Sequence, residues 1–267
     1  MVSQLPWNSK TGTLKRELAQ GMMDPASRSA LEAALQLKEK HRGRVHICTI
    51  TMGPAMAEEI LYQAKALGAD EGVLLTDIRM AGADTFLTSH ILARFIQMER
   101  NNFDLLLCGS QTSDSETAQV GPQLAEELDI PAIGYIKHIK LKDRTVEVER
   151  HVDDFYEVLA MDLPGLVTVD YTAYTPRYLA LEGVEKAFED PDITIVNAQR
   201  LGLDEDFNAL KESPTRIVDV YSPAVRKENT MLTGAVKKIV NQLFDEFGKT
   251  ISSAMAKDLK THEHDGA

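Results

Sequence analysis

Residues 105–131 read LLLCGSQTSDSETAQVGPQLAEELDIP, and this stretch decides the fold. The run from Phe103 to Cys108 is apolar and short, which is typical of a buried strand. Gly109 follows at once, and a polar loop then leads into a helical pattern that includes Val120. A strand, a glycine, a polar loop and a helix N-terminus together offer free backbone N–H groups and a positive dipole end to an anion.

The loop adds hydroxyl donors at the same place. They belong to Ser110, Thr112, Ser113, Ser115 and Thr117. The stretch contains neither the Gly-Lys-Ser/Thr of a P-loop nor a G-x-G-x-x-G motif. On local chemistry alone, a capped strand-to-helix turn that binds nothing fits the pattern equally well.

The same residues carry a resemblance to a known family. From Gly109 to Pro122 the chain resembles the nucleotide-binding signature of electron transfer flavoprotein β subunits, roughly G-x-Q-x-x-D-x-D-x-x-Q-x-G-P. The matching residues are Gly109, Gln111, Asp114, Gln119, Gly121 and Pro122. Glu116 stands where the family usually has Asp, and further similarity runs from about Thr11 to Arg216.

The resemblance implies a nucleotide site built from the 109–122 signature and two further segments. In residues 23–27, Asp24 replaces the Asn that usually precedes the proline of the family. Residues 51–54 match a small-residue turn near the adenosine part of the nucleotide. The implied cofactor-binding residues are Asp24, Pro25, Ala26, Ser27, Met52, Gly53, Cys108, Gly109, Ser110, Gln111, Thr112, Ser113, Asp114, Glu116, Thr117, Ala118, Gln119 and Val120.

The resemblance also implies a cofactor and a partner subunit. Family members pair with an α subunit that carries the redox-active flavin. Housekeeping members hold AMP in the β-subunit pocket, whereas electron-bifurcating members hold a second FAD that accepts a hydride from NADH. Residues 202–216 resemble the Gly-Leu…Gly-Ser-Pro-Thr-Arg run of the bifurcating group, with Glu212 in place of a glycine. We therefore expect FAD rather than AMP.

A docking segment for redox partners is implied at residues 176–181, which resemble the family's partner-recognition loop. We expect Tyr178 and Leu181 to contact a partner such as an acyl-CoA dehydrogenase, although an ordinary proline-bounded loop would read the same. Many relatives carry a lysine run after this loop. Here residues 185–192 contain one lysine and four carboxylates, which suits a basic or apolar partner face unless the stretch is a solvated linker.

Composition excludes several classes of protein. The chain has 267 residues and a net charge of −12, which argues against nucleic-acid binding because that requires a basic surface. No apolar run approaches the roughly 20 residues of a membrane span, and the N-terminus lacks a signal-peptide pattern. Cys48 and Cys108 have no metal-site spacing, so we expect free thiols in a reducing cytoplasm.

Periodicity predicts an α/β protein with a Rossmann-like parallel sheet, and the resemblance implies the adenine-nucleotide α-hydrolase-like variant. The expected helices are 24–40, 55–67, one opening at Asp84, and 234–259. The expected strands are 44–52, 72–75, 103–108, 132–141, 145–151, 156–161, 166–171 and 193–197. The four strands after Pro131 predict antiparallel additions to the sheet, residues 187–192 a loop or linker, and residues 202–215 irregular chain.

Two parts are expected, a nucleotide-binding core over residues 1–194 and a C-terminal helical arm over residues 195–267 that docks on the α subunit. One helical face of the arm is apolar and carries Val236, Ile239, Val240, Leu243, Phe244, Phe247 and Ile251. Family members begin with an apolar strand that is central in the sheet, whereas Val2 to Pro6 resemble only the end of that segment. We therefore expect the first family strand to be missing and the sheet to have a gap or an exposed edge.

No catalytic constellation is visible in the sequence. The seven histidines are scattered, no Gly-x-Ser-x-Gly elbow occurs, and adjacent carboxylates read as solvated surface. This absence suits a protein whose chemistry belongs to a bound cofactor. A stand-alone adenine-nucleotide-binding sensor of the universal-stress type is the alternative, although its Gly-rich phosphate run is absent.

Overall fold

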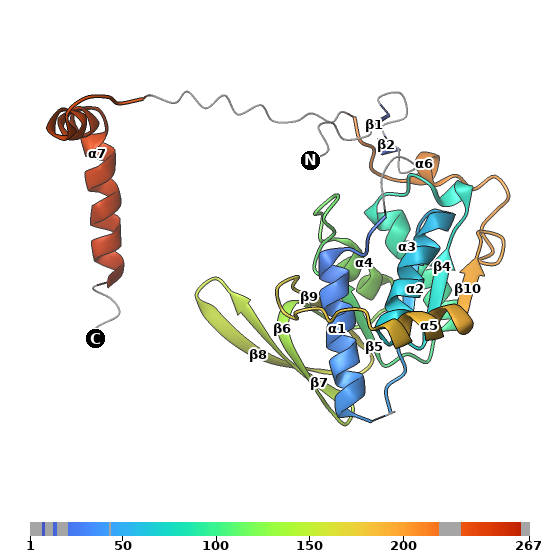
Figure 1. Ribbon diagram of the computed structural model, residues 1–267. Coiled ribbons are helices and arrows are strands. Elements are labelled where there is room, and N and C mark those ends of the chain that lie inside the picture. Colours follow the sequence, from blue (N-terminus) through green and yellow to red (C-terminus); the bar gives the residue numbers. More distant parts are fainter. Residues whose placement is uncertain (1–6, 9–12, 15–20, 43, 219–230, 263–267) are drawn as a thin grey trace. The chain divides into compact units, whose positions relative to one another are not determined.

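The computed structural model describes residues 7–8, 13–14, 21–42, 44–218 and 231–262 (Figure 1). The chain divides into two compact units, Met1–Val220 and Tyr221–Ala267. The boundary expected between residues 194 and 195 falls inside strand β10 (Ile193–Val196). Buried residues between 198 and 209 contribute to the hydrophobic core of the first unit, so this part of the expected arm packs with that unit.

A three-stranded parallel sheet forms one half of the first unit. Its order is β10-β4-β3, with β4 at Glu71–Leu75 and β3 at Cys48–Met52. The expected strand over residues 44–52 therefore begins four residues later than predicted. The strand over 72–75 and the one over 193–197 are confirmed to within a residue.

A five-stranded sheet forms the other half, in the order β5-β9-β6-β7-β8. Its strands are β5 (Leu105–Gly109), β6 (Ala132–Lys142), β7 (Thr145–Val152), β8 (Phe155–Asp162) and β9 (Gly165–Val169). Antiparallel pairing is confirmed between β6 and β7 and between β7 and β8, but β9 pairs parallel to both β5 and β6. All five residues of β9 are buried, as a parallel strand covered on both faces requires.

The expected gap lies between β3 and β5, which belong to separate sheets. Every residue of β3 and of β5 is only half-buried, whereas the inner strands β4 and β9 are buried almost throughout. Each of the two strands is paired on one edge only, within the described residues. The parallel sheet is therefore interrupted at its centre.

Two helical layers cover opposite faces of the sheets. Leu105 and Leu107 of β5 pack against α1 (Pro25–Lys40), whereas Leu106 and Cys108 pack on the side of α3 (Thr85–Glu99) and α4 (Val120–Glu127). Successive side chains of a strand point to opposite faces, so α1 lies opposite α3 and α4. A further cluster of buried hydrophobic residues joins α1 to α2 (Glu58–Leu67), and α2 therefore lies in the same layer as α1.

Helix starts follow the capping signals. The Asp24 side chain accepts hydrogen bonds from the N–H groups of Ala26 and Ser27, and Pro25 occupies the first turn of α1. Asp84 caps α3 in the same way by accepting from Leu87 N–H. Both predicted helices are confirmed. The helix predicted over 55–67 begins as a 3-10 turn, Ala55–Ala57, before α2.

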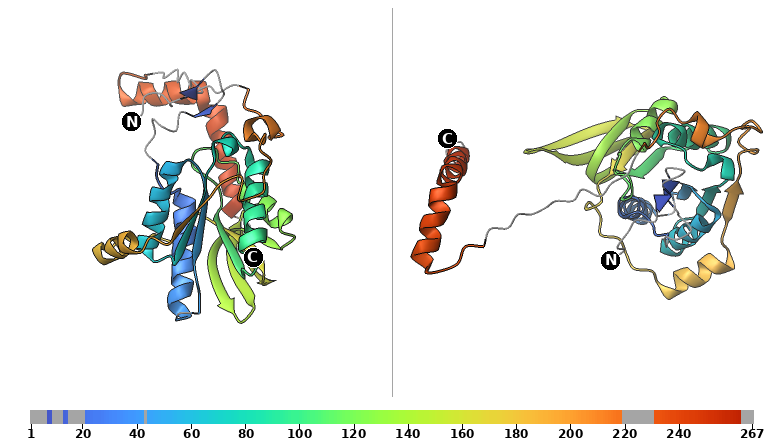
Figure 2. Two further views of the ribbon diagram at one scale, coloured as in Figure 1. Left: turned by 90° about the vertical axis from the view of Figure 1, so that its right-hand side faces the viewer. Right: turned by 90° about the horizontal axis from the view of Figure 1, so that it is seen from above.

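Helix α5 (Leu181–Glu189) corrects the prediction of a loop for residues 187–189, whereas residues 190–192 do form the loop that leads into β10. Figure 2 shows α5 on the outer side of α2. A side chain at Gly183 would collide with the carbonyl oxygen of Ala66, so the glycine permits this close packing. Tyr62 and Phe188 stack between the same helices with ring centroids 5.1 Å apart. Tertiary packing therefore decides the conformation of a stretch whose acidic composition suggests a loop.

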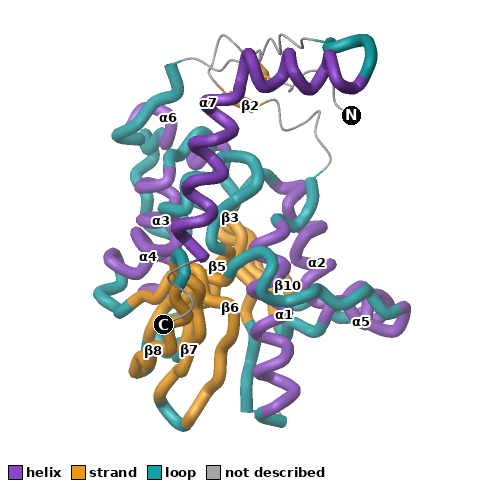
Figure 3. Tube along the Cα trace, turned by 90° about the vertical axis from the view of Figure 1, so that its left-hand side faces the viewer, coloured by secondary structure: helices purple, strands orange, loops and turns teal. Residues whose placement is uncertain are grey.

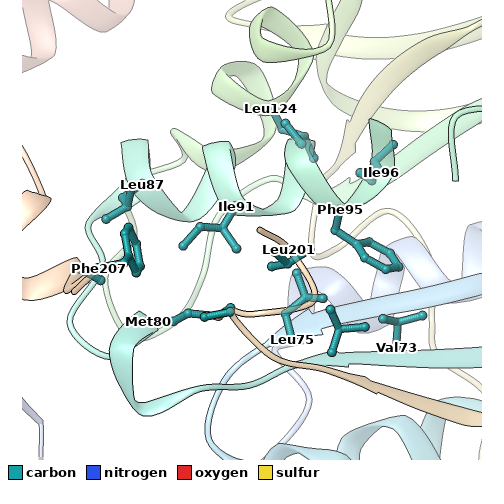
Figure 4. Close-up of a cluster of buried hydrophobic side chains, with 14 of the residues drawn as sticks. Val73, Leu75, Met80, Leu87, Ile91, Phe95, Ile96, Leu124, Leu201 and Phe207 are labelled. Atoms are coloured by element: carbon teal, nitrogen blue, oxygen red, sulfur yellow. The ribbon is translucent and has the colours of Figure 1, made fainter. Parts of the chain in front are cut away.

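The segment after β10 completes the core beneath α3. Figure 4 shows Leu201 and Phe207 pointing toward Leu87, Ile91 and Phe95 of α3. A short helix, α6 (Ala209–Glu212), follows, so the expected irregular segment 202–215 includes one helical turn. These contacts hold residues 198–209 on the same face as α3.

The hairpin of β7 and β8 and helix α7 are the remaining elements. Figure 3 shows the strands β6, β7 and β8 lying together in the first unit. In the second unit, α7 (Val236–His262) confirms the predicted C-terminal helix. No described helix is long and apolar enough to cross a membrane. A two-residue pairing of β1 (Trp7–Asn8) with β2 (Thr13–Leu14) stands apart from both sheets.

Candidate nucleotide-binding site

The site is built where β5 ends against the first turn of α1. A Cβ atom at Gly109 would lie 2.7 Å from the Ser27 nitrogen and 2.8 Å from the Ala26 carbonyl carbon. No side chain fits at this distance, so only glycine lets the strand end and the helix start meet. The sequence singles out this glycine, and its contact with α1 supplies the physical reason.

Asp24 ties the loop after β5 to α1. One carboxylate oxygen caps α1, and the other accepts a hydrogen bond of 2.7 Å from the Ser113 N–H. The two residues are 89 positions apart in sequence. Because the carboxylate occupies the N-terminal N–H groups of α1, that helix end is not the better place for a phosphate.

The loop from Gln111 to Gln119 is held in a compact turn. Thr112 and Ser115 share a hydroxyl–hydroxyl hydrogen bond of 2.8 Å, and the Glu116 N–H donates to the Thr112 carbonyl at 2.9 Å. Glu116 and Ala118 have φ values of 50° and 56°, in the left-handed region that non-glycine residues seldom adopt. Such turns orient successive backbone N–H groups toward one side, which is how anion-binding loops are made.

Helix α4 follows this loop with an uncapped N-terminus. Gln119 is its N-cap residue but makes no capping bond, and the first turn holds no acidic side chain. The Gln119 side-chain oxygen instead accepts a hydrogen bond of 2.7 Å from the Thr85 hydroxyl at the start of α3. Gln119 therefore does not cap the N–H groups of the first turn of α4, which carry the positive end of the helix dipole.

A second rim of the site comes from the chain after α6. The N–H and hydroxyl of Thr215 donate to the Asp84 carboxylate at 2.9 and 2.8 Å, and the Asp84 N–H donates to the Ser213 hydroxyl. Burial raises the pKa of Asp84, but the hydrogen bonds from Leu87 and Thr215 outweigh it and hold that pKa below its ordinary value. An ionised Asp84 therefore fastens residues 213–215 beside the start of α3.

The loop after β4 is anchored in the same region. The Asp77 carboxylate accepts hydrogen bonds from Arg79 and from the Ala198 N–H. The guanidinium of Arg79 is the main reason that the pKa of Asp77 lies far below its usual range. The turns after β3, β4 and β5 thus end at one edge of the first unit, the carboxyl edge at which open α/β sheets bind ligands.

These segments enclose a cavity of about 3650 Å³ within the first unit. Its lining includes the expected residues Asp24, Ser27, Met52, Gly53, Cys108, Gly109, Ser110, Gln111, Thr112, Ser113, Asp114, Thr117, Ala118, Gln119 and Val120. Pro25, Ala26 and Glu116 are not part of the lining. The volume far exceeds the roughly 300–1,000 Å³ of common ligand pockets. The excess arises because the cavity continues from the carboxyl edge into the gap between β3 and β5.

Sequence reasoning missed Thr85 as a member of the site, and it used residues 213–215 only as a signature of cofactor type. Thr85 and Thr215 both line the cavity. The helix-capping position of Asp84 was the available signal, because a capping residue brings its neighbours to the strand-end edge. The partner of Thr85, Gln119, lies 34 residues away and could not be read from spacing.

Neither cysteine of the cavity wall is poised for redox chemistry. Burial and the nearby Glu71 carboxylate raise the pKa of Cys48 to about 12, and burial raises the pKa of Cys108 to about 11. Both thiols are free and stay protonated at neutral pH, so neither is a nucleophile. Among the described residues, no group of three or more His, Cys, Asp and Glu side chains could hold a metal ion.

The expected docking residues lie away from this cavity. Tyr178 is 94% exposed and Leu181 is 76% exposed, at the junction between the strand β9 region and α5. Neither lines the cavity. Tyr178 and Leu181 are three residues apart, and both expose large hydrophobic side chains on the surface.

Comparison with known proteins identifies the family to which this geometry belongs. Residues 11–198 match the family model described as electron transfer flavoprotein domain. The chain is 38% identical over 235 residues to the electron transfer flavoprotein subunit beta of Thermoanaerobacterium thermosaccharolyticum, which covers 88% of this chain and 89% of that protein.

Two further relatives carry more specific names. The caffeyl-CoA reductase–Etf complex subunit CarD of Acetobacterium woodii is 40% identical over 225 residues, covering 84% of this chain and 85% of CarD. The acryloyl-CoA reductase electron transfer subunit gamma of Anaerotignum propionicum is 36% identical over 241 residues, covering 88% and 89% of the two chains. The matched region includes every segment of the carboxyl-edge site up to residue 198.

Proposed function

Because the chain belongs to the electron transfer flavoprotein family as a β subunit, we propose that it binds FAD at the carboxyl edge and transfers electrons in a heterodimer with an α subunit. The observation that carries this proposal is the contact of Gly109 with Ala26 and Ser27, locked by the Asp24–Ser113 hydrogen bond. It joins the strand end, the loop and α1 into one cradle next to the uncapped α4 N-terminus.

The cradle fits a dinucleotide. Glycine at 109 lets the end of β5 meet the first turn of α1 with no side chain between them. The phosphates are proposed to lie beside the backbone N–H groups of the loop that follows and of the first turn of α4. Hydroxyls of the same loop, from Thr112 and Ser115 among others, face a cavity large enough for FAD. The favourable interaction of one anion with a helix N-terminus is about 0.3–1 kcal/mol when exposed and up to ~2 kcal/mol when partly buried.

FAD is proposed rather than AMP because of the position of residues 213–215. Residues 213–215, part of the run that resembles the bifurcating group, are fastened by Asp84 to the rim of the cavity, where a group longer than AMP would reach them. The bound FAD would supply the electron-accepting ring, with NADH as the proposed hydride donor.

The protein's own residues then bind and orient the cofactor and take no part as acids, bases or nucleophiles. The loop 109–117 holds the phosphates through backbone N–H groups, and Met52 and Gly53 form the neighbouring wall of the cavity. Cys48 and Cys108 are free thiols, which are already reduced and so cannot accept electrons from the flavin.

The α subunit is the proposed partner of helix α7. Its apolar stripe is exposed on the described chain, with Phe244 and Phe247 about half accessible. A helix with such a stripe requires a second surface to bury it. The redox partner, an acyl-CoA dehydrogenase or similar flavoenzyme, is proposed to contact Tyr178 and Leu181.

A stand-alone adenine-nucleotide sensor is not favoured. The family match spans residues 11–198, and the relatives named above cover more than four fifths of the chain. The exposed α7 stripe has no role in a protein that acts alone.

The proposal is tested by Gly109→Ala in the complex with the α subunit. The added Cβ would overlap the first turn of α1, so we expect this variant to lose the nucleotide of the β-subunit site while the flavin of the α subunit stays bound. Gly134→Ala is the matched control, since its Cβ would make only an ordinary 3.5 Å contact with Thr168. Nucleotides released by acid are quantified by chromatography, and circular dichroism checks the fold of both variants. Full occupancy in folded Gly109→Ala would refute the site.

A further inference from the structure

The segment that leads to the docking residues is fastened to α1 by buried hydrogen bonds. Ser29 is fully buried, and its hydroxyl donates to the Asp170 carbonyl at 2.9 Å while accepting from the Tyr174 N–H at 3.2 Å. The Tyr174 hydroxyl accepts a bond of 3.0 Å from the Ile139 N–H of β6. Residues 170–174 are thus held between α1 and the sheet.

Arg177 makes the last and strongest of these attachments. Its Nε and Nη2 donate to the two carboxylate oxygens of Glu32 at 2.8 and 3.0 Å, and its own backbone N–H adds a third bond at 3.2 Å. The Arg177 Nη1 donates at 2.7 Å to the carboxylate of Glu39, which lies about two helical turns after Glu32 on α1. The Arg28 side chain donates to the Arg177 carbonyl. Two parallel bonds from one guanidinium fix direction as well as distance.

Glu32 is an unusual residue at this position of α1. It is only 6% exposed, yet it carries a charge on the face of α1 that meets the 170–177 segment. Burial raises its pKa, but the hydrogen bonds from Arg177 and Gln36 outweigh burial and keep the carboxyl ionised. A buried carboxylate is seldom retained unless its partner is held in one geometry.

The chain turns outward immediately after Arg177. Tyr178 is 94% exposed, and Leu181 at the start of α5 is 76% exposed. Beyond them, Gly183 fixes α5 against Ala66 of α2. The exposed segment 178–181 is therefore held at both ends, by the Glu32–Arg177 pair on α1 and by the Gly183 contact on α2.

We propose that Glu32 and Arg177 are positioning residues for partner docking, because they hold the base of the segment Tyr178–Leu181 in one place and direction on α1. This inference rests on the docking role proposed above. Neither residue needs to touch the partner. Their contribution lies in the order they impose on the exposed segment, which would otherwise lose conformational freedom on every encounter.

The test uses the complex with the α subunit and an acyl-CoA dehydrogenase, reduced by its acyl-CoA substrate, as the electron donor. Initial rates give the KM for the dehydrogenase and kcat for the wild type, Glu32→Gln, Arg177→Lys and Leu181→Ala. The matched control is Lys38→Gln, which breaks another ion pair of α1, the 2.6 Å contact with Asp70, in which neither Glu32 nor Arg177 takes part. Arg177→Lys keeps the charge and loses the two-bond geometry, so it serves even if Glu32→Gln folds poorly.

We expect KM to rise about tenfold in Glu32→Gln and in Arg177→Lys, a change equivalent to ~1.4 kcal/mol, with kcat little changed. Lys38→Gln should behave as the wild type. In a Leu181→Ala background, Glu32→Gln should add little, because both act through the same segment.

Three results would overturn the inference. They are an unchanged KM in both positioning variants, an equal rise in Lys38→Gln, and effects of Glu32→Gln and Leu181→Ala that multiply. An unchanged KM in Leu181→Ala itself would remove the docking role of the segment and the inference with it. Nucleotide content measured on the same samples separates either failure from loss of the cofactor site.

Discussion

Filling the gap between β3 and β5 should stabilise the protein. The perturbation is an apolar strand of five residues, such as Val-Ile-Val-Ile-Val, fused ahead of Met1 through a Gly/Ser linker; five residues match the lengths of β3 and β5. Because α1 leads into β3, a strand that precedes α1 and runs parallel to β3 would use α1 as a right-handed crossover. Apolar residues suit both faces, since α1 and α3 cover opposite sides.

The expected stabilisation follows from two favourable contributions and one cost. Burying an apolar side chain contributes about 1.5–3 kcal/mol, whereas ordering a residue costs about 1.5 kcal/mol. Backbone hydrogen bonds to the two free edges add about 0.5–1.5 kcal/mol each. The net stabilisation is on the order of 3–5 kcal/mol, and a domain of this size gains about 2–4 °C in Tm per kcal/mol. We therefore expect Tm to rise by roughly 6–20 °C.

Calorimetry measures Tm, and hydrogen exchange reports on the amides of β3 and β5. Both strands should become protected in the extended protein. The control is the same extension with proline at its central position, which removes an N–H donor and prevents a central strand. An unchanged Tm with unchanged exchange, or an equal gain from the proline version, would refute the interpretation of the gap as a site for a strand.

Three other predictions follow from exposed and buried groups. The exposed stripe of α7 predicts that the chain aggregates when expressed alone and becomes soluble with its α subunit; a stable monomer by size-exclusion chromatography with light scattering would contradict this. Changing Glu189, Asp190 and Asp192 to lysine should slow electron transfer to the native partner, most strongly at low salt, because a partner with a basic or apolar docking face is expected; equal rates across an ionic-strength series would exclude a role in recognition. Burial raises the pKa of Glu32, but the hydrogen bonds from Arg177 and Gln36 lower it by more than burial raises it. The pKa therefore lies below the ordinary value of 4.5. Its contribution to the free energy of unfolding is complete above pH 4.5 and is lost as pH falls through the lower folded-state pKa, so Glu32→Gln should flatten the acid side of a Tm–pH profile, and parallel profiles would contradict this.

Local signals in the sequence were sufficient for most helices and strands. Asp24 with Pro25 and Asp84 with its following apolar pattern mark helix starts whose capping bonds form within three residues. The run at β5 is short, apolar and ended by a glycine, and the structure gives it nearly the predicted bounds. In each case the deciding interaction lies within a few residues of the pattern.

Non-local packing explains the features that the sequence did not predict. Helix α5 packs on α2 because Gly183 leaves room for the Ala66 carbonyl, 117 residues earlier in the sequence. The acidic composition of α5 gives no sign of this contact. Strand β9 follows a hairpin in sequence, yet it pairs parallel to β5 and β6, and its burial on both faces was the signal for this. The Asp24–Ser113 bond, which joins two segments of the site, likewise spans 89 residues.

The flavin and AMP content of the purified αβ complex tests the central claim most directly. The measurement combines the flavin absorbance of the denatured complex with chromatographic quantification of FAD and AMP per heterodimer. We predict two FAD molecules, of which one is lost in Gly109→Ala, and no stoichiometric AMP. One FAD accompanied by one AMP would contradict the choice of cofactor, and one FAD with no second nucleotide would contradict a nucleotide site at Gly109.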